Sequence, residues 1–154
     1  MMYNRAEFSS TSMPEIFRME VEKQVAVLND NLLAIENLSD QTDGSASQRL
    51  ETLMRSAHSL KGAARIVGLD QVVQVAHAME DCFVAAQKGT LHIDSLYVDV
   101  LLQGVDWFVA LGNVQAEQQS EWLEQQTDLI AQLIDDLAHL SAASVKSFDS
   151  LAPT

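Results

Sequence analysis

The sequence predicts an all-α protein, an antiparallel up-down four-helix bundle with an additional C-terminal fifth helix. Apolar residues recur at intervals of three and four along five segments, and no segment alternates apolar and polar residues for long enough to form a sheet. The connections between the second, third and fourth segments are short, which favours antiparallel neighbours. With 154 residues, 47% of them hydrophobic, the chain can bury one sizeable core.

The first helix is expected to begin at Ser12 and to end at Leu38. Ser12 is a good N-cap, Pro14 suits a first turn, and Glu15 follows three residues after the serine. The preceding residues 1–11 carry no apolar pattern and are predicted to be a flexible N-terminal tail. The residues expected to face the core from this helix are Ile16, Met19, Val21, Val25, Leu28, Leu32 and Ile35.

Four further helices are expected over about residues 47–67, 70–89, 94–112 and 117–140. A glycine stands at or just after the end of the first three of them, where it can end a helix. The apolar stripe of each helix is expected to face the core, and these stripes include Leu96 in the fourth helix and Leu129 in the fifth. Residues 12–140 are therefore predicted to be one helical-bundle domain. Residues 141–154, where the pattern is lost, are predicted to be a linker or flexible C-terminal tail.

The formal net charge of −13 argues against partners that are themselves anionic. Nucleic acid and anionic lipid are bound by neutralising their charge with lysine and arginine, so neither is expected as a partner. No apolar run approaches the roughly 20 residues of a membrane span, and no export signal opens the chain. We therefore expect a cytoplasmic protein. The lone Cys82 is expected to be a small core residue without a chemical role.

The segment "SAHSLKGAAR" in the second helix presents a histidine beside the core stripe but outside it. At about 100° per residue, His58 points away from the core, and its neighbours one turn on are Lys61 and Gly62. A glycine inside a helix costs about 1 kcal/mol relative to alanine, so an advantage should offset it. We interpret that advantage as access, because a glycine leaves room for another protein beside the imidazole of His58.

Charge is also concentrated on this helix. Four of the nine basic residues lie on it, namely Arg49, Arg55, Lys61 and Arg65. A local positive patch on an acidic protein suggests docking against an acidic partner or contact with a transferred phosphoryl group.

The third helix carries His77 and Glu80 one turn apart, at the flank of its apolar stripe. Antiparallel packing of the second and third helices could bring Glu80 close to His58. A carboxylate that accepts a hydrogen bond from one ring nitrogen would set the tautomer and leave the other nitrogen unprotonated. His58 would then be a nucleophile held ready for reaction.

The run "AHSLKGAARIVGL", followed by His77 and Glu80, resembles the histidine-phosphotransfer (HPt) domain of the CheA-type chemotaxis histidine kinases and their hybrid relatives. The resemblance covers about residues 16–140. It implies that His58 is phosphorylated, that Lys61 and His77 support it, and that Glu80 holds its ring. Gly62 falls at the close-approach glycine of the family and, with Arg55 and Arg65, would belong to the partner-docking surface.

The same resemblance implies the partners. An ATP-binding kinase domain would phosphorylate His58, and an aspartate of a response-regulator receiver domain would then take the phosphoryl group. The chain itself contains no G-x-x-x-x-G-K-[ST] loop and no second domain for an ATP site, so no cofactor is expected on it. ATP and Mg²⁺ would come with the partner domains.

Several readings stay open at this point. The chain could be a stand-alone phosphorelay protein, although its polar C-terminal end favours an amino-terminal domain excised from a longer kinase. From a different class, a metal-binding four-helix bundle could use His77, Glu80 and Asp81, but di-iron bundles require Glu-x-x-His pairs on two helices and inward-facing glutamates on two others. A purely structural helical adaptor would leave the segment around His58 unexplained.

Overall fold

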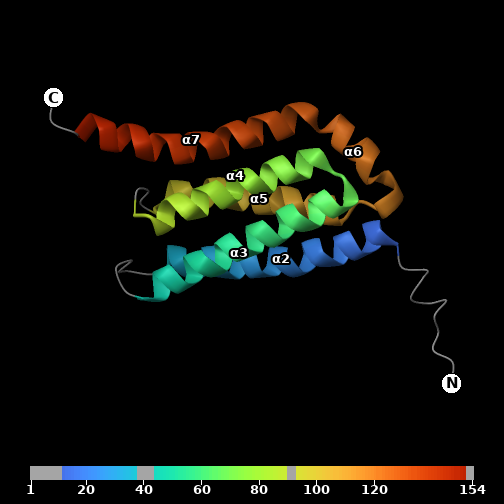
Figure 1. Cartoon of the computed structure of the whole chain (residues 1–154), viewed down its shortest axis with the longest axis horizontal. Coiled ribbons are helices and arrows are strands. Elements are labelled where there is room, and N and C mark those ends of the chain that lie inside the picture. The colour runs from blue at the N-terminus through green and yellow to red at the C-terminus, as the bar shows by residue number, and fades with distance from the viewer. Residues whose placement is uncertain (1–11, 38–43, 90–92, 152–154) are drawn as a thin grey trace, which may run out of the picture.

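A computed structural model describes residues 12–37, 44–89 and 93–151, with side chains described as far as Ser141. The helices are α2 (Met13–Glu36), α3 (Gly44–Val67), α4 (Asp70–Gln87), α5 (Ser95–Gly112), the 3₁₀ turn η1 (Ala116–Gln118), α6 (Gln119–Gln125) and α7 (Thr127–Leu151). Within these ranges there is no strand (Figure 1). The predicted all-α class is confirmed. The expected tail over residues 1–11, the expected helix end at Leu38 and residues 152–154 lie outside the described residues.

Helices α2 to α5 form the predicted bundle. α3 packs between α2 and α4, α5 packs on α2, and α7 runs along α4 and α5 as the additional C-terminal helix (Figure 1). The turn between α3 and α4 consists of Gly68 and Leu69, and the two helices pack side by side as antiparallel neighbours (Figure 1). The centre of the bundle is apolar and fully buried, with side chains that include Leu28, Leu32, Leu53, Leu60, Met79, Leu101, Phe108 and Leu111.

Helix α2 begins as expected and differs in the face that it buries. The hydroxyl oxygen of Ser12 accepts a hydrogen bond from the Glu15 amide at 3.2 Å, which caps the first turn. Ile16 and Met19, expected in the core, are 46% and 64% exposed, whereas Phe17 is buried. The buried face of α2 includes the polar Gln24. A prediction from apolar residues alone could not include it, and therefore rotated the expected buried face away from the observed one.

The same one-residue error occurs in two other helices. Leu96 is exposed and its neighbour Tyr97 is buried, because the Tyr97 hydroxyl donates a 2.7 Å hydrogen bond to the carbonyl of Cys82 inside the bundle. In α7, Leu129 is exposed and Ile130 is buried. The expected start of α5 is confirmed, since the Asp94 side chain accepts from the Tyr97 amide at 2.9 Å.

The prediction of a single helix over residues 117–140 is wrong in two respects. It is interrupted at Gln126, where the Thr127 hydroxyl donates to the Glu124 carbonyl at 2.8 Å, so η1 and α6 cross the end of the bundle before α7 begins (Figure 1). α7 then continues to Leu151 instead of ending near residue 140. No glycine or proline stands between Thr127 and Leu151, so loss of the apolar pattern did not bring loss of the helix. The domain boundary at 140 stays a prediction.

Helix α5 is long and apolar enough to pass a length-and-composition test for a membrane span. Half of the 18-residue window is buried inside the bundle, which is what a core helix shows. It is the only helix among the described residues that passes this test, and one such helix is weak evidence for a span.

Candidate functional site

His58 lies in the middle of α3, and its side chain is 66% exposed. Its Nδ1 is 2.7 Å from Oε2 of Glu80 on α4. An ionised carboxylate can only accept hydrogen bonds, so Nδ1 carries the hydrogen and Nε2 keeps its lone pair. The structure therefore brings His58 and Glu80 together as the sequence predicted, and the arrangement leaves an exposed imidazole with one nitrogen free to act as a nucleophile.

Lys61 reaches the other oxygen of the same carboxylate. Its Nζ donates to Oε1 of Glu80 at 2.6 Å, and the two side chains are only 11% and 14% exposed. The sequence placed Lys61 on the surface beside His58, and this was wrong. The stem of the lysine is buried between α3 and α4 because its ammonium group has a carboxylate to pair with there. Glu80 thus accepts one hydrogen bond at each oxygen, and both donors fix its orientation.

The charge state of Glu80 follows from its surroundings. Partial burial by itself would raise the pKa of this carboxyl, but the hydrogen bonds from Lys61 and His58 and the positive charge of Lys61 outweigh burial and hold the pKa below its ordinary value. Glu80 is therefore a carboxylate at neutral pH. It can orient His58 and can also stabilise any positive charge that develops on the ring.

His77 is close to Glu80 but has no direct contact with His58 among the described interactions. Its Nδ1 is 3.8 Å from Oε1 of Glu80, and its Nε2 is 3.5 Å from Oδ2 of Asp81. Neither contact is a hydrogen bond, and the His77 side chain is 56% exposed. The supporting role expected for His77 stays a prediction.

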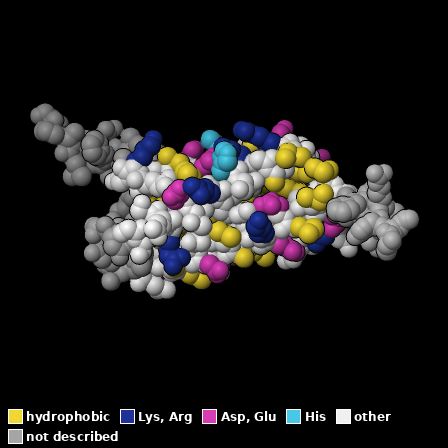
Figure 2. Space-filling model, turned by 60° about the horizontal axis from the view of Figure 1, so that its bottom comes forward, with side chains coloured by type: hydrophobic (Ala, Val, Ile, Leu, Met, Phe, Trp, Pro, Cys, Tyr) yellow, Lys and Arg dark blue, Asp and Glu magenta, His cyan; other side chains and the backbone are white. Residues whose placement is uncertain are grey.

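Gly62 borders a groove beside His58. A Cβ built on Gly62 would meet no atom within 4 Å, so the open space expected at this position is present. The groove has a volume of about 420 Å³ and lies between the first turns of α2 and the C-terminal half of α3. Figure 2 shows hydrophobic side chains gathered on the same face of the molecule as the histidines. The groove is lined by Met13, Ile16, Phe17, Glu20, His58, Ser59, Gly62, Ala63, Ile66 and Val67.

The positive patch expected on the second helix is weaker than the sequence suggested. Lys61 is buried against Glu80, and Arg55 pairs with Glu51 on its own helix at 2.6 Å. Arg49 donates to the side-chain oxygen of Asn31 at 3.1 Å. Arg65 is exposed in the last turn of α3. The docking roles expected for Arg55 and Arg65 stay predictions, and the surface next to His58 is predominantly apolar rather than basic.

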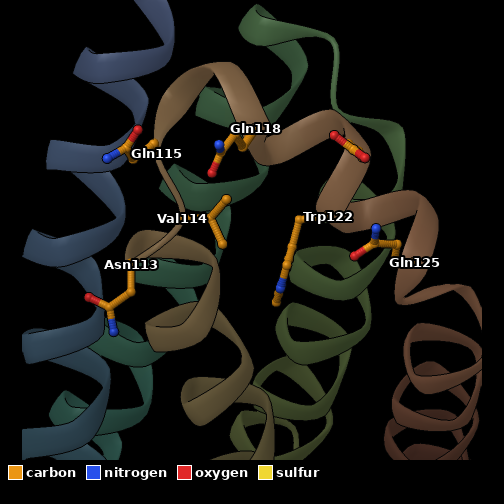
Figure 3. Close-up of a pocket in the computed structure, with 7 residues that line it drawn as sticks. Asn113, Val114, Gln115, Gln118, Trp122 and Gln125 are labelled. Carbon is orange, nitrogen blue, oxygen red and sulfur yellow. The ribbon is translucent and has the colours of Figure 1, made fainter.

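The part of the chain that the structure describes brings together no group of three or more histidine, cysteine, aspartate or glutamate side chains that could hold a metal ion. A second hollow, of about 580 Å³, lies at the bundle end that η1 and α6 cross (Figure 3). Trp122 and the amide side chains of Asn113, Gln115, Gln118 and Gln125 line it. Val114 and Glu121 complete its lining, which contains no histidine, serine or cysteine, so the histidine site remains the candidate.

The groove itself was missed by sequence reasoning. Ile16 and Ile66 were read as core-facing or left unassigned, and they are 46% and 70% exposed beside His58. The signal that could have found them is an apolar residue directly next to a stripe position, as Ile16 is to Phe17 and Ile66 to Val67.

Comparisons with known proteins agree with this geometry. The family model described as "Hpt domain" matches residues 12–143. The chemotaxis protein CheA of Treponema pallidum is 32% identical over 117 residues, 76% of this chain and 14% of that protein. CheA of Halobacterium salinarum is 32% identical over 103 residues, which are 66% of this chain and 15% of that protein. CheA of Listeria monocytogenes is 34% identical over 92 residues, which are 60% of this chain and 14% of that protein. The chain thus spans about a seventh of these relatives. No solved structure gives a significant match.

Proposed function

The chain belongs to the Hpt (histidine-phosphotransfer) domain family of chemotaxis-type two-component signalling, and from that premise we propose that His58 is its phosphoryl-carrying residue. The observation that carries the proposal is the 2.7 Å contact between Nδ1 of a largely exposed His58 and a carboxylate that is itself held by Lys61. It leaves Nε2 as the one unprotonated, accessible ring nitrogen.

The loading step is a displacement at phosphorus. The Nε2 lone pair attacks the γ-phosphorus of ATP held by a kinase domain, the N–P bond forms, the bond to the β,γ-bridging oxygen breaks, and ADP leaves with that electron pair. Because Nδ1 keeps its hydrogen, the phosphorylated ring is cationic. Glu80 at 2.7 Å stabilises this charge, and its pairing with Lys61 keeps the carboxylate in place.

The transfer step reverses the roles. A carboxylate oxygen of an aspartate on a receiver domain attacks the same phosphorus, the N–P bond breaks, and its electron pair returns to Nε2 as an acyl phosphate forms. His58 is then again neutral and hydrogen-bonded to Glu80. The chain needs no metal of its own for this cycle, because Mg²⁺ and ATP come with the partner domains.

We further propose that the kinase domain belongs to the same longer chain, as the length of the CheA relatives suggests, and that the domain works in the cytoplasm. The alternative is a stand-alone phosphorelay protein that receives its phosphoryl group from a separate kinase. The sequence that follows the domain in its gene distinguishes the two.

The proposal is tested by incubating the chain with radiolabelled ATP and a purified CheA-type kinase domain. The expected product carries one acid-labile label, and peptide mapping places the label on His58. The variant His58→Gln is expected to take up none, while the matched variant His139→Gln, which changes an exposed histidine on α7, is labelled normally. Label that persists in His58→Gln would exclude the assignment.

A further inference from the structure

The groove beside His58 contains one charged group among apolar side chains. Met13, Ile16 and Ile66 are 50%, 46% and 70% exposed, which is unusual for large apolar side chains grouped on one surface. Glu20 lies among them, and His58 forms part of the same wall. A protein that brings an acceptor to Nε2 of His58 from this side of α3 therefore stands against the groove.

The Glu20 carboxylate is held in place by a short chain of hydrogen bonds from the interior. Gln24 Nε2 donates to Glu20 Oε1 at 2.6 Å, and Ser56 Oγ donates to Gln24 Oε1 at 2.7 Å. Gln24 and Ser56 are 8% and 3% exposed. Buried polar groups that are satisfied in this way hold one rotamer, so Glu20 is presented to the groove in a defined position.

No lysine, arginine or histidine in the described part of the chain forms an ion pair with Glu20. The other carboxylate near the site, Glu80, accepts from two donors. A carboxylate that is covered by a partner without a counter-charge would lose its hydration and weaken the complex. The groove therefore fits a surface that combines apolar side chains with one cation.

Of the two proteins that must reach His58, the receiver domain requires the closer approach. ATP extends its γ-phosphate on a triphosphate arm, whereas an aspartate carboxylate stands only two carbons from the backbone. The receiver surface must therefore come near α3 itself, and Gly62, which has empty space where a Cβ would be, permits that approach. The groove is then covered during transfer.

We propose that Glu20 is a specificity-determining residue for the receiver domain: it pairs with a lysine or arginine on an otherwise apolar surface next to the acceptor aspartate. This rests on the proposed role of His58. Charge pairs of this kind select among partners of similar shape, because a receiver without the cation would leave Glu20 buried and unpaired.

The experiment measures transfer from phosphorylated His58 to a receiver domain, using receiver domains from the source genome, purified one by one, with the fastest acceptor as the probe. At receiver concentrations below saturation, Glu20→Gln is expected to slow transfer about fivefold and Glu20→Lys about tenfold or more. Gln keeps a carbonyl for the bond from Gln24, so the fold is retained. The matched control Glu22→Gln removes the same charge from an exposed position of α2 outside the groove and is expected to transfer normally.

A charge-reversal scan identifies the partner residue. Each lysine and arginine of the receiver is changed singly to glutamate, and one of these variants is expected to recover transfer with Glu20→Lys while losing it with the unmodified chain. The inference is overturned if Glu20→Gln transfers at the Glu22→Gln rate, or if it slows loading by the kinase and leaves transfer unchanged. Failure of the proposed function looks different, because His58 would then take up no label in any variant.

Discussion

At the scale of single residues, Glu80 joins the chemistry of the site to the stability of the fold. Its carboxylate accepts from both His58 and Lys61. In Glu80→Gln only one side-chain oxygen remains, so His58 and Lys61 cannot both donate to an oxygen, and the ammonium of Lys61, 11% exposed, loses its counter-charge. We expect the free energy of unfolding to fall by about 1–3 kcal/mol in urea titrations at neutral pH, and labelling of His58 to slow while helicity is retained. Unchanged labelling would show that Glu80 does not orient His58.

The pKa of Glu80 gives that prediction a pH dependence. The folded-state pKa is lowered from its ordinary value of 4.5, so the carboxylate contributes stability above about pH 4.5, and this contribution is lost as the pH falls through the lowered pKa. The difference in unfolding free energy between the wild-type chain and Glu80→Gln should therefore shrink below pH 4.5. Glu124→Gln, at an exposed position, is the matched control for the loss of one carboxylate.

Gly62 tests steric access at the site. It is not among the glycines with positive φ, and an added Cβ meets nothing within 4 Å. Gly62→Ala should therefore raise the unfolding free energy by about 0.5–1 kcal/mol in thermal or urea melts. The same methyl group stands beside His58, so transfer to a receiver should slow, and Gly62→Leu should slow it further. Wild-type transfer rates in both variants would mean that access is not the reason for the glycine.

The contact of His58 with Glu80 was predictable because it depends on helical spacing and antiparallel packing alone. The burial of Lys61 was not predictable, since a lysine at the edge of a stripe can extend into water or towards a neighbouring helix. The position of the Glu80 carboxylate decides which of these two directions the Lys61 side chain takes. Glu20 was missed for a related reason: its place in the groove depends on the buried Gln24, a polar residue in an apolar stripe.

At the scale of helices, the sequence predicted those helix ends that are marked by a glycine with positive φ or by a capping side chain. Gly68 has φ +76° and ends α3, and the Leu69 amide donates to the Ala64 carbonyl at 3.0 Å across the turn. Asp94 caps α5 through its side chain. The break at Gln126 has neither glycine nor proline, and a hydrogen bond from Thr127 accompanies it, so no residue pattern announced it.

Gly68 provides a prediction opposite in sign to Gly62. Its positive φ is strained for any residue with a side chain, although the space around it is open. Gly68→Ala should therefore lower the unfolding free energy by about 1 kcal/mol, whereas Gly62→Ala raises it. Paired urea titrations of the two variants measure this difference. A stabilised Gly68→Ala would contradict the left-handed geometry at the end of α3.

At the scale of the whole molecule, the described part of the site uses one side of the bundle. The catalytic contacts join α3 to α4, and the groove joins α2 to α3. α7 packs on α4 and α5, and none of its residues whose side chains are described takes part in the catalytic contacts or lines the groove. This separation predicts that α7 can loosen without changing the chemistry of His58, and Cys82 reports such loosening.

Cys82 is fully buried on α4, with Sγ 3.3 Å from the Leu137 carbonyl of α7. Burial raises the pKa of its thiol to about 11, so the folded protein holds almost no accessible thiolate at pH 8. We expect a thiol reagent such as a dithiobis-nitrobenzoate to react with Cys82 only through opening of α7, and far more slowly than with the unfolded chain.

Leu137→Ala removes a fully buried side chain and should accelerate the reaction by at least about tenfold, because such substitutions cost about 2–5 kcal/mol. Leu129→Ala, at an exposed position of the same helix, should leave the rate unchanged. Labelling of His58 should proceed normally in both variants under conditions where they remain folded. Immediate reaction of the wild-type thiol would show that α7 does not cover Cys82 in solution.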